Sequence, residues 1–384
     1  MADSVIRKKL ILIGNGLDIA IGLKTRYSDF ILYYFKAKIY ELAEMEPNEE
    51  DMNFCVRDKF YAVNITKDKL PIIGLFKLQL TEALKKISDC KSVVEIFATL
   101  RKEGFFWECS PFLWELLNTA QWCDVERTYY TELLRLYNQL GKGKMPREPK
   151  NEFTIEGLNQ ELDELKKYVE IYLIEEQQRT QKLLDEMDHL QVFVRQTIAS
   201  PYDKSDSSLW VNFNYTNAMT KALEKTFGEG RIPVLHIHGE LGNEANPIIF
   251  GYGDDTDEHF SSLESANVDE YLRHFKAYRY SQNENYEKLL GFIENSEYFE
   301  VALIGHSCGL SDRTMLKTIF EHERCKSIEI YHYNEGEKEA KEEFFYKDIS
   351  IGRHFNDKVK KRSRVKSFDQ FYKIPQNKKS NKEN

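Results

Sequence analysis

The sequence predicts an α/β fold in which a doubly wound, mostly parallel, Rossmann-like sheet is interrupted by a large helical insertion. The apolar run LILI at residues 10–13 ends in Gly-Asn-Gly, which is typical of a buried strand that turns into a helix at the start of a nucleotide-binding domain. Helical periodicity then dominates from about Tyr27 to Ser200. Strand-like runs return after Ser208, so we expect the strands on both sides of the insertion to share one sheet.

The helical region is predicted from its apolar spacing. PFLWELLNTAQW and YYTELLRLYNQL carry apolar residues at three- and four-residue intervals, and residues 156–198 continue this spacing with one glycine and no proline. We interpret 156–198 as one or two long helices of a packed subdomain. A coiled-coil partner is the alternative, but the heptads are irregular and aromatic residues intrude.

The strands after the insertion are predicted from five short runs rich in β-branched or aromatic residues, namely LWVNFNYT, IPVLHIHG, PIIFGYG, FEVALIGHS and SIEIYHYN. With the first strand they make about six strands, and helices are expected within 258–296 and 312–323. The predicted domains are a nucleotide-binding α/β domain at 1–30 and 205–345, a helical insertion at 31–204, and a basic C-terminal segment at 346–384. We expect the aromatic residues of FDQFY to dock on the body and the last ten residues to be solvated and disordered.

Composition excludes several classes of protein. The chain has 384 residues, 41% of them hydrophobic, and a formal net charge of −9, so a dedicated duplex-DNA binder is not expected. Its six cysteines form no CxxC pair, which excludes a zinc ribbon and indicates reduced thiols. The N-terminal apolar run is shorter than the roughly 7–15 residues of a signal peptide, and no run approaches the roughly 20 residues of a membrane span. We expect a cytoplasmic protein that does not enter membranes.

Polar residues end every predicted strand, and ligands of open parallel sheets bind at the carboxyl ends of the strands. The candidate site residues are therefore, in strand order, Gly14, Asn15, Gly16 and Asp18; Asn214, Tyr215, Thr216 and Asn217; His236, His238, Gly239 and Glu240; Asp254 and Asp255; Gly305, His306, Ser307, Ser311 and Asp312; and Asn334. Of these, His238 precedes a glycine at the expected crevice and is a candidate base.

Each candidate also has a purely structural interpretation. The glycines of the first turn would serve its backbone angles, and position 19 is Ile rather than the third glycine of a dinucleotide fingerprint. Asn214 and the Ser311–Asp312 pair would cap helices. Asp18 would either cap the first helix or accept hydrogen bonds from ribose hydroxyls or the nicotinamide carboxamide, which favours a ligand with donor groups beside its phosphates.

The order of these blocks resembles the AbiH-type bacteriophage abortive infection proteins. The resemblance is carried by LILIGNGLDIAIGLKTRYSDF, NFNYTNAM, HIHGEL, IIFGYGDD and IGHSCGLSDRTMLKTIFEH, and it covers the first thirty residues and most of 208–334. It implies an anti-phage effector, and a phage-derived trigger is an expected partner.

The same blocks are more distantly similar to sirtuins and sirtuin-like NAD hydrolases. This implies a sirtuin-like fold that takes NAD as substrate or ligand, with Asn214 and His238 as catalytic residues. It further implies that the dinucleotide contacts Gly14, Asn15, Gly16, Asp18, Tyr215, Thr216, Gly239, Gly305, His306, Ser307 and Asn334. The paired-cysteine zinc module of the deacylases is missing, so cleavage of NAD is expected without a metal, and protein deacylation is not.

Three hypotheses follow. The first is an NAD glycohydrolase effector that hydrolyses the bond between nicotinamide and ribose. The second is a non-catalytic module that senses NAD, ADP-ribose or ATP and controls assembly, with the helical insertion as the surface for homo-oligomers. The third is a metal-dependent phosphoesterase or nuclease that uses His236, His238, Asp254 and Asp255, with the basic tail engaging nucleic acid. We favour the first, with a small dinucleotide and no nucleic acid as partner.

Overall fold

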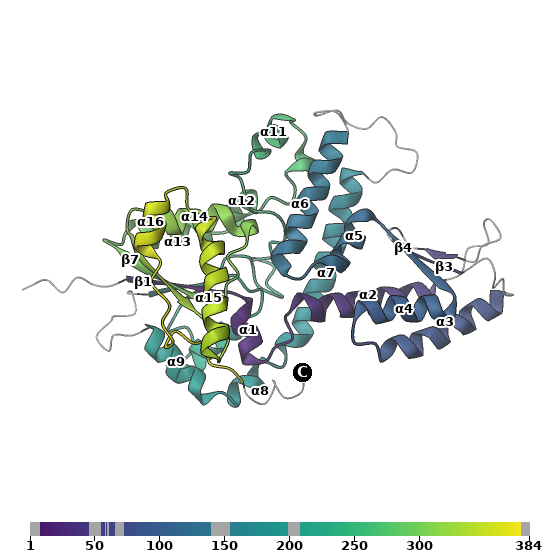
Figure 1. The fold of residues 1–384 in the computed structure, drawn as a ribbon, viewed down its shortest axis with the longest axis horizontal. Helices are drawn as coiled ribbons and strands as arrows, with labels where there is room; N and C mark the ends of the chain where they lie inside the picture. The colour runs from purple at the N-terminus through teal and green to yellow at the C-terminus, as the bar shows by residue number, and fades with distance from the viewer. Residues whose placement is uncertain are drawn as a thin grey trace, which may run out of the picture. The chain divides into compact units, whose positions relative to one another are not determined.

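The computed structural model describes residues 8–45, 55–57, 59, 61–65, 73–139, 154–198 and 208–377. The chain divides into two compact units (Figure 1). The first, here called the α/β unit, comprises Met1–Thr25 and Leu173–Asn384, and the second, the insertion unit, comprises Arg26–Tyr172.

The α/β unit is built on a five-stranded parallel sheet. Its strands are β1 (Lys8–Ile13), β5 (Ser208–Asn212), β6 (Val234–His236), β7 (Phe299–Ile304) and β8 (Cys325–Tyr331), and their spatial order is β6-β5-β1-β7-β8. The predicted α/β class and parallel pairing are confirmed, and the strands before and after the insertion share one sheet.

Helices cover both faces of this sheet, because the apolar residues of β1 alternate between two cores. On one face, Leu10 and Leu12 share a core with residues of α13 (Asn285–Glu294) and α14 (Arg313–Glu321). On the other face, Ile11 and Ile13 share a core with α1 (Asn15–Ile21), α8 (Thr180–Asp185), α9 (Asp188–Ile198) and α10 (Ala218–Phe227). A strand buried on both sides explains why its sequence is continuously apolar.

Residues 247–253 do not form the sixth strand that their composition predicts. The Ile249 amide donates to the His238 carbonyl at 2.7 Å, and the Tyr252 amide donates to the His274 carbonyl at 3.0 Å. The backbone of this segment therefore pairs with loops instead of the sheet. The neighbouring region 258–296 is broken into short helices, α11 (Phe260–Ser265), α12 (Lys276–Arg279) and α13, with 3₁₀ turns at Asp269–Tyr271 and Tyr280–Gln282.

The sequence predicts a helical insertion, but the insertion unit contains strands as well as helices. It contains α2 (Tyr27–Glu44), α3 (Ile73–Ser88), α4 (Val93–Glu103), α5 (Pro111–Glu115), the 3₁₀ turn Leu116–Asn118, α6 (Trp122–Gln139) and most of α7 (Ile155–Gln177). It also contains an antiparallel sheet of β2 (Cys55–Arg57), β3 (Tyr61–Ile65) and β4 (Phe105–Cys109). The expected one or two helices over 156–198 are three, α7 to α9, and α8 and α9 pack against the sheet of the α/β unit.

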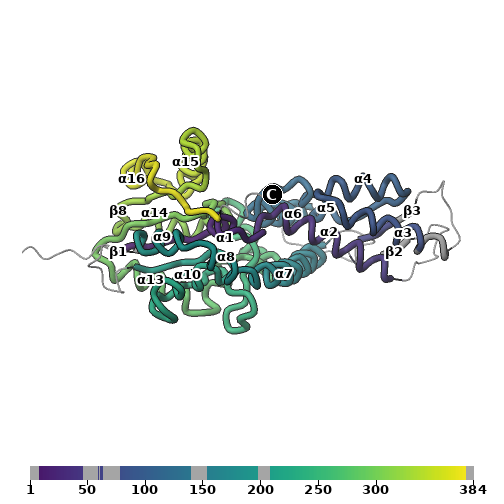
Figure 2. The backbone as a smooth tube through the Cα atoms, turned by 90° about the horizontal axis from the view of Figure 1, so that it is seen from below, coloured from purple at the N-terminus to yellow at the C-terminus, as the bar shows by residue number. Residues whose placement is uncertain are grey.

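The C-terminal segment is packed against the α/β unit. Helices α15 (Glu337–Gly352) and α16 (Lys358–Arg364) lie beside β8 (Figure 2), and the chain then continues as an extended strap. The docking predicted for the aromatic residues of FDQFY is confirmed for Phe368, whose ring centroid lies 5.5 Å from that of His332, and for Tyr372, which lies 5.1 Å from Tyr331. It is wrong for Phe371, which is 82% exposed. The Asn377 amide donates to the Ala20 carbonyl at 2.8 Å. The expected disorder of the last ten residues is therefore wrong for 375–377, while residues 378–384 lie outside the described part of the chain.

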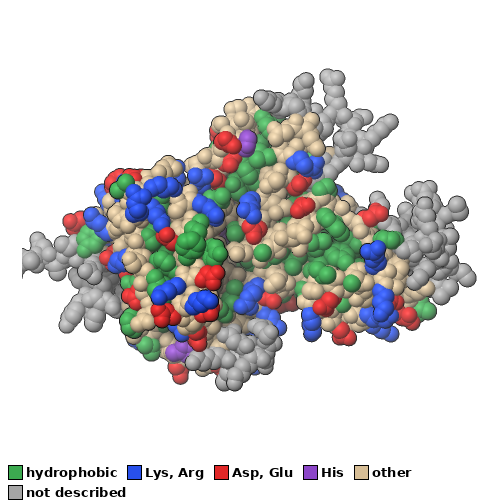
Figure 3. Space-filling view, viewed as in Figure 1, with side chains coloured by type: hydrophobic (Ala, Val, Ile, Leu, Met, Phe, Trp, Pro, Cys, Tyr) green, Lys and Arg blue, Asp and Glu red, His purple; other side chains and the backbone are tan. Residues whose placement is uncertain are grey.

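None of the helices in the described residues is long and apolar enough to cross a membrane. The face drawn in Figure 3 carries Lys and Arg side chains interspersed with Asp and Glu. Hydrophobic side chains gather on that face over α15, where Phe345 and Tyr346 are exposed.

Candidate functional site

The carboxyl ends of the five parallel strands meet at one edge of the sheet. From β1 the chain places β5 and β6 on one side and β7 and β8 on the other, so the strand order reverses between β1 and β7. A crevice for ligands forms at such a reversal. Asn214 follows β5, His238 follows β6 and His306 follows β7, so the predicted site residues arise from neighbouring strand ends.

A buried carboxylate, Asp312, is the centre of a polar group at this edge. Nζ of Lys276 donates to its Oδ1 at 2.8 Å, and Nε2 of His238 lies 3.2 Å from the same oxygen. Nε2 of His306 lies 3.5 Å from Oδ2. We call these four residues the Asp312 cluster; each is at most 6% exposed. The ring of Phe213 lies edge-on to both histidines, at 5.1 and 4.2 Å, and joins the cluster to the end of β5.

The protonation states of the cluster follow from its contacts. Burial raises the pKa of Asp312, but the charge of Lys276 beside it outweighs burial and holds that pKa well below its ordinary value. Burial lowers the pKa of His306 to about 3. Nδ1 of this neutral imidazole accepts from the Cys308 amide at 3.0 Å, so its proton sits on Nε2 and faces Asp312. The cluster thus holds an ionised carboxylate beside an ammonium and a neutral imidazole.

A second polar group is centred on Asp18, which is 1% exposed. Nδ2 of Asn214 donates to its Oδ1 at 2.9 Å, and the Thr216 hydroxyl donates to its Oδ2 at 2.5 Å. Burial raises the pKa of Asp18 to about 7, although the bonds from Thr216 and Asn214 lower it in part. Asp18 does not cap α1, because it lies within that helix. The capping position is Gly14, and no side chain makes a capping hydrogen bond there. Its carboxylate is engaged by the chain, and a contact with ribose stays a prediction.

The glycines of the first turn permit a close backbone contact. The Gly14 and Gly16 amides donate to the carbonyls of Ile304 and Gly305, both at 2.9 Å. A Cβ at Gly14 would lie 2.4 Å from Cα of His306, and one at Gly305, where φ is +70°, would lie 2.5 Å from the Leu17 nitrogen. This is the structural role considered for the glycines. The two amides are occupied by carbonyls, and their contact with a phosphate stays a prediction.

The loop after β7 is held in an unusual conformation by the C-terminal segment. Cys308 has φ of +55°, a left-handed value that non-glycine residues seldom adopt. Nε2 of His354, just after α15, bonds to the Cys308 carbonyl at 2.9 Å, and the ammonium of Lys347 donates to the His306 carbonyl. Ser307, within this loop, is exposed.

The remaining residues that the sequence predicts for the dinucleotide site have contacts of their own. The side-chain amide of Asn15 donates to the Thr25 carbonyl at 2.8 Å, and the Tyr215 hydroxyl donates to the Ile249 carbonyl at 3.0 Å. Gly239 has φ of +87° and lies against Pro247. Asn334 is exposed, and its side-chain amide donates to the Glu343 carboxylate at 2.9 Å.

The four residues of the metal hypothesis have different partners. Nε2 of His236 lies 3.0 Å from the Thr220 hydroxyl, Asp254 accepts from Arg313 at 3.0 Å, and Asp255 accepts from Thr314. Among the described residues, no group of three or more His, Cys, Asp or Glu side chains is arranged to hold a metal ion.

The structure adds one residue that the sequence did not list, Lys276, and gives Asp312 a role other than the helix cap considered for it. Lys276 lies in α12, within a region predicted only as helical, and no local pattern distinguishes it. Asp312 is among the strand-end candidates, for which a helix cap was the alternative interpretation. It precedes α14 and makes no side-chain cap there, because its oxygens face Lys276 and the histidines.

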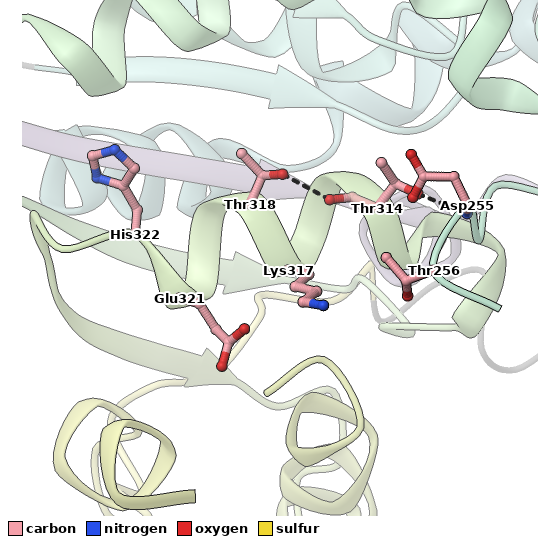
Figure 4. A pocket seen from close by; sticks show the side chains of 7 residues that line it. All are labelled: Asp255, Thr256, Thr314, Lys317, Thr318, Glu321 and His322. Atoms are coloured by element: carbon pink, nitrogen blue, oxygen red, sulfur yellow. Dashed lines mark hydrogen bonds between the residues drawn. The ribbon is translucent and has the colours of Figure 1, made fainter. Parts of the chain in front are cut away.

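A surface pocket of about 420 Å³ lies apart from these residues, along α14 (Figure 4). It is lined by Asp255, Thr256, Thr314, Lys317, Thr318, Glu321 and His322. Its lining includes no member of the Asp312 cluster, and it mixes acidic and basic side chains without a buried polar centre.

Comparison with known families identifies the chain. The family described as bacteriophage abortive infection AbiH matches residues 10–333, which contain every site residue from Gly14 to Asp312. The chain belongs to this AbiH family. No curated protein and no solved structure matches it. Membership of this family indicates a role in bacteriophage abortive infection. The distant similarity of the chain to sirtuins stays a prediction.

Proposed function

We propose that this AbiH-family protein is an abortive-infection effector that binds NAD at the carboxyl edge of its parallel sheet and hydrolyses the bond between nicotinamide and ribose. The observation that carries the proposal is the approach of His238 to the ionised Asp312, at 3.2 Å, next to the strand end that bears Asn214. The order of the parallel strands, 3-2-1-4-5 when they are numbered along the chain, is also that of dinucleotide-binding sheets.

The chemistry suits this set of groups. Nicotinamide leaves as a neutral pyridine, so the reaction needs orientation, stabilisation of a cationic ribose and an activated water more than it needs an acid. Asn214 would hold the ribose hydroxyls and the water. His238 would take the proton of the water, and Asp312 would stabilise the imidazolium that forms. The products are nicotinamide, ADP-ribose and one proton.

Nicotinamide release by the purified full-length protein tests the proposal, with and without lysate from phage-infected cells. Cellular NAD in infected bacteria that express the protein is the second measurement. His238→Ala is expected to lower turnover by about 10²–10⁴-fold, the usual contribution of a positioned base. His259→Ala, at an exposed histidine whose side chain is 50% accessible, is the control and should match the wild type.

The alternatives predict different results. Binding of NAD without nicotinamide release, together with undiminished cellular NAD during infection, would reject hydrolysis and favour nucleotide sensing. Stoichiometric metal in the purified protein with phosphodiester cleavage would favour the phosphoesterase. Equal turnover by wild type and His238→Ala would remove His238 from the mechanism.

A further inference from the structure

Asp18 is buried, accepts hydrogen bonds on both carboxylate oxygens, and has no part in the proposed hydrolysis of NAD. Its two donors, Asn214 and Thr216, follow β5 and lie almost two hundred residues further along the chain. A buried carboxylate is costly unless it is hydrogen-bonded, and here both bonds come from the turn that bears the proposed catalytic asparagine. Asp18 therefore links α1 to that turn.

The backbone of the turn is fixed by another asparagine. Oδ1 of Asn212 accepts from the Asn214 amide at 3.0 Å, and its Nδ2 donates to the Thr216 carbonyl at 3.0 Å. With the backbone held in this way, the main freedom left to Asn214 is the orientation of its side-chain amide. The contact with Asp18 decides that orientation.

An ionised carboxylate only accepts hydrogen bonds, so it selects the amide orientation in which nitrogen faces Asp18. The carbonyl oxygen of Asn214 then points away from Asp18. Among the described residues nothing donates a hydrogen bond to this oxygen. The turn thus presents an acceptor to a ligand at this point, and not a donor.

We infer that Asp18 is a positioning residue that holds Asn214 with its carbonyl oxygen toward the ligand, so that the site selects ligands with hydroxyl or water hydrogens at this point, such as the terminal ribose of ADP-ribose. This inference rests on the proposed function. It assigns Asp18 to the orientation of Asn214 and not to direct contact with the ligand.

Protonation of Asp18 changes the arrangement. The groups that bond to it, Asn214 and Thr216, are uncharged, and burial sets its pKa at about 7. A protonated carboxyl carries an O–H donor, which no longer selects the amide nitrogen. Selection for the ribose hydroxyls is therefore present when Asp18 is ionised, above about pH 7, and is lost as the pH falls through that value.

Calorimetric titration with ADP-ribose and with ADP, which lacks the terminal ribose, tests this role without any turnover. The wild type should prefer ADP-ribose, and the preference should rise from pH 6 to pH 8. Asp18→Asn should lower the preference about tenfold at pH 8, the effect of one hydrogen bond in a charged network, and remove its pH dependence, with ADP affinity unchanged. Thr216→Val should lower it less.

Asp185→Asn makes the same substitution on the exposed face of α8 and should behave as wild type. If Asp18→Asn keeps the preference and its pH dependence while remaining folded, the positioning role is wrong although the proposed function stands. If the wild type binds neither compound, the proposed function and this role fail together.

Discussion

Asp312 in the α/β unit and Glu161 in the insertion unit are both buried carboxyl groups, but their partners differ. Asp312 faces Lys276 and two histidines, and its pKa is held well below its ordinary value. In the insertion unit, Glu161 is 3% exposed and accepts a hydrogen bond from the Ser110 hydroxyl at 2.7 Å. Burial raises its pKa to about 8. An ionised carboxylate is maintained at Asp312 because the fold brings a cation to it, and this distinguishes Asp312 from Glu161.

The surroundings of the two acids differ as well. The insertion core is aromatic: Phe35, Tyr61, Phe97 and Trp107 pack with ring centroids 4.9–6.3 Å apart. Such rings supply burial and leave few donors for an acid such as Glu161. The core of the α/β unit is mostly aliphatic, and several of its buried polar side chains, such as His238, His306 and Asp312, lie at the carboxyl edge of the sheet.

Removing the carboxylate from the Asp312 cluster should have the largest effect on stability. Asp312→Ala leaves the Lys276 ammonium buried without its partner, which costs about 3–5 kcal/mol in such pairs. Hydrogen exchange of peptides from β5 and β7 should report the loss, with the insertion unit unchanged. The double variant Lys276→Met, Asp312→Leu removes both charges and should recover most of the stability. Wild-type exchange in Asp312→Ala would show that the pair is not important.

Glu161→Gln should sharpen the contrast between Glu161 and Asp312, because it should change how the stability of the insertion unit depends on pH. Because the folded-state pKa of about 8 exceeds the ordinary 4.5, the stabilising proton is fully present below about pH 4.5 and is lost as the pH rises through 8. The wild-type insertion unit should therefore weaken on going from pH 5 to pH 9, by up to about 4 kcal/mol at 1.36 kcal/mol per pKa unit.

The glutamine variant keeps a neutral side chain and should lose that pH dependence, which urea unfolding at pH 5, 7 and 9 would measure. At pH 5 the two proteins should be equally stable. Parallel stability curves for the two proteins would mean that Glu161 is ionised in the fold.

The difference between two glycine variants should be the smallest of these effects. An alanine at 305 or at 230 would have to adopt the left-handed backbone angle of the glycine, φ +70° or +66°. Only the Cβ at 305 would meet backbone atoms, because no described atom lies within 4 Å of a Cβ added at 230. Both pay about 1–2 kcal/mol for the angle, and Gly305→Ala should cost about 1–3 kcal/mol more for the crowded contact with α1. Thermal unfolding measures the difference. Equal costs would show that the contact between Gly305 and Leu17 relaxes easily.

Sequence patterns predicted the parallel strands well, because each is an apolar run closed by a turn residue. They failed at 247–253, whose composition is that of a strand but whose amides bond to the loops at His238 and His274. They also missed the pairing of β3 with β4, because partners such as Tyr61 and Cys109 lie far apart in the chain. Strand pairing between distant segments depends on the fold and leaves no local periodicity.

The candidate site was predicted in part for the same reason. Residues at strand ends, such as Asn214 and His238, are found from the sequence alone. Lys276 is brought to Asp312 by the loop contact between its own amide and the Tyr252 carbonyl, at 2.8 Å, which no local pattern reveals. Asp312 itself is found at a strand end, but the sequence does not reveal its role, because a carboxylate before a helix has a simpler local role as a cap.

The family match ends at residue 333, whereas the loop after β7 depends on His354 and Lys347 beyond it. The end of the family match is therefore not a folding boundary. A fragment cut at 333 would uncover Phe320 and Ile328, which pack against Phe355 and Val365, and would release the carbonyls of His306 and Cys308. Expression of this protein for any assay therefore has to retain the chain through Asn377, and an affinity tag belongs after that residue or at the N-terminus.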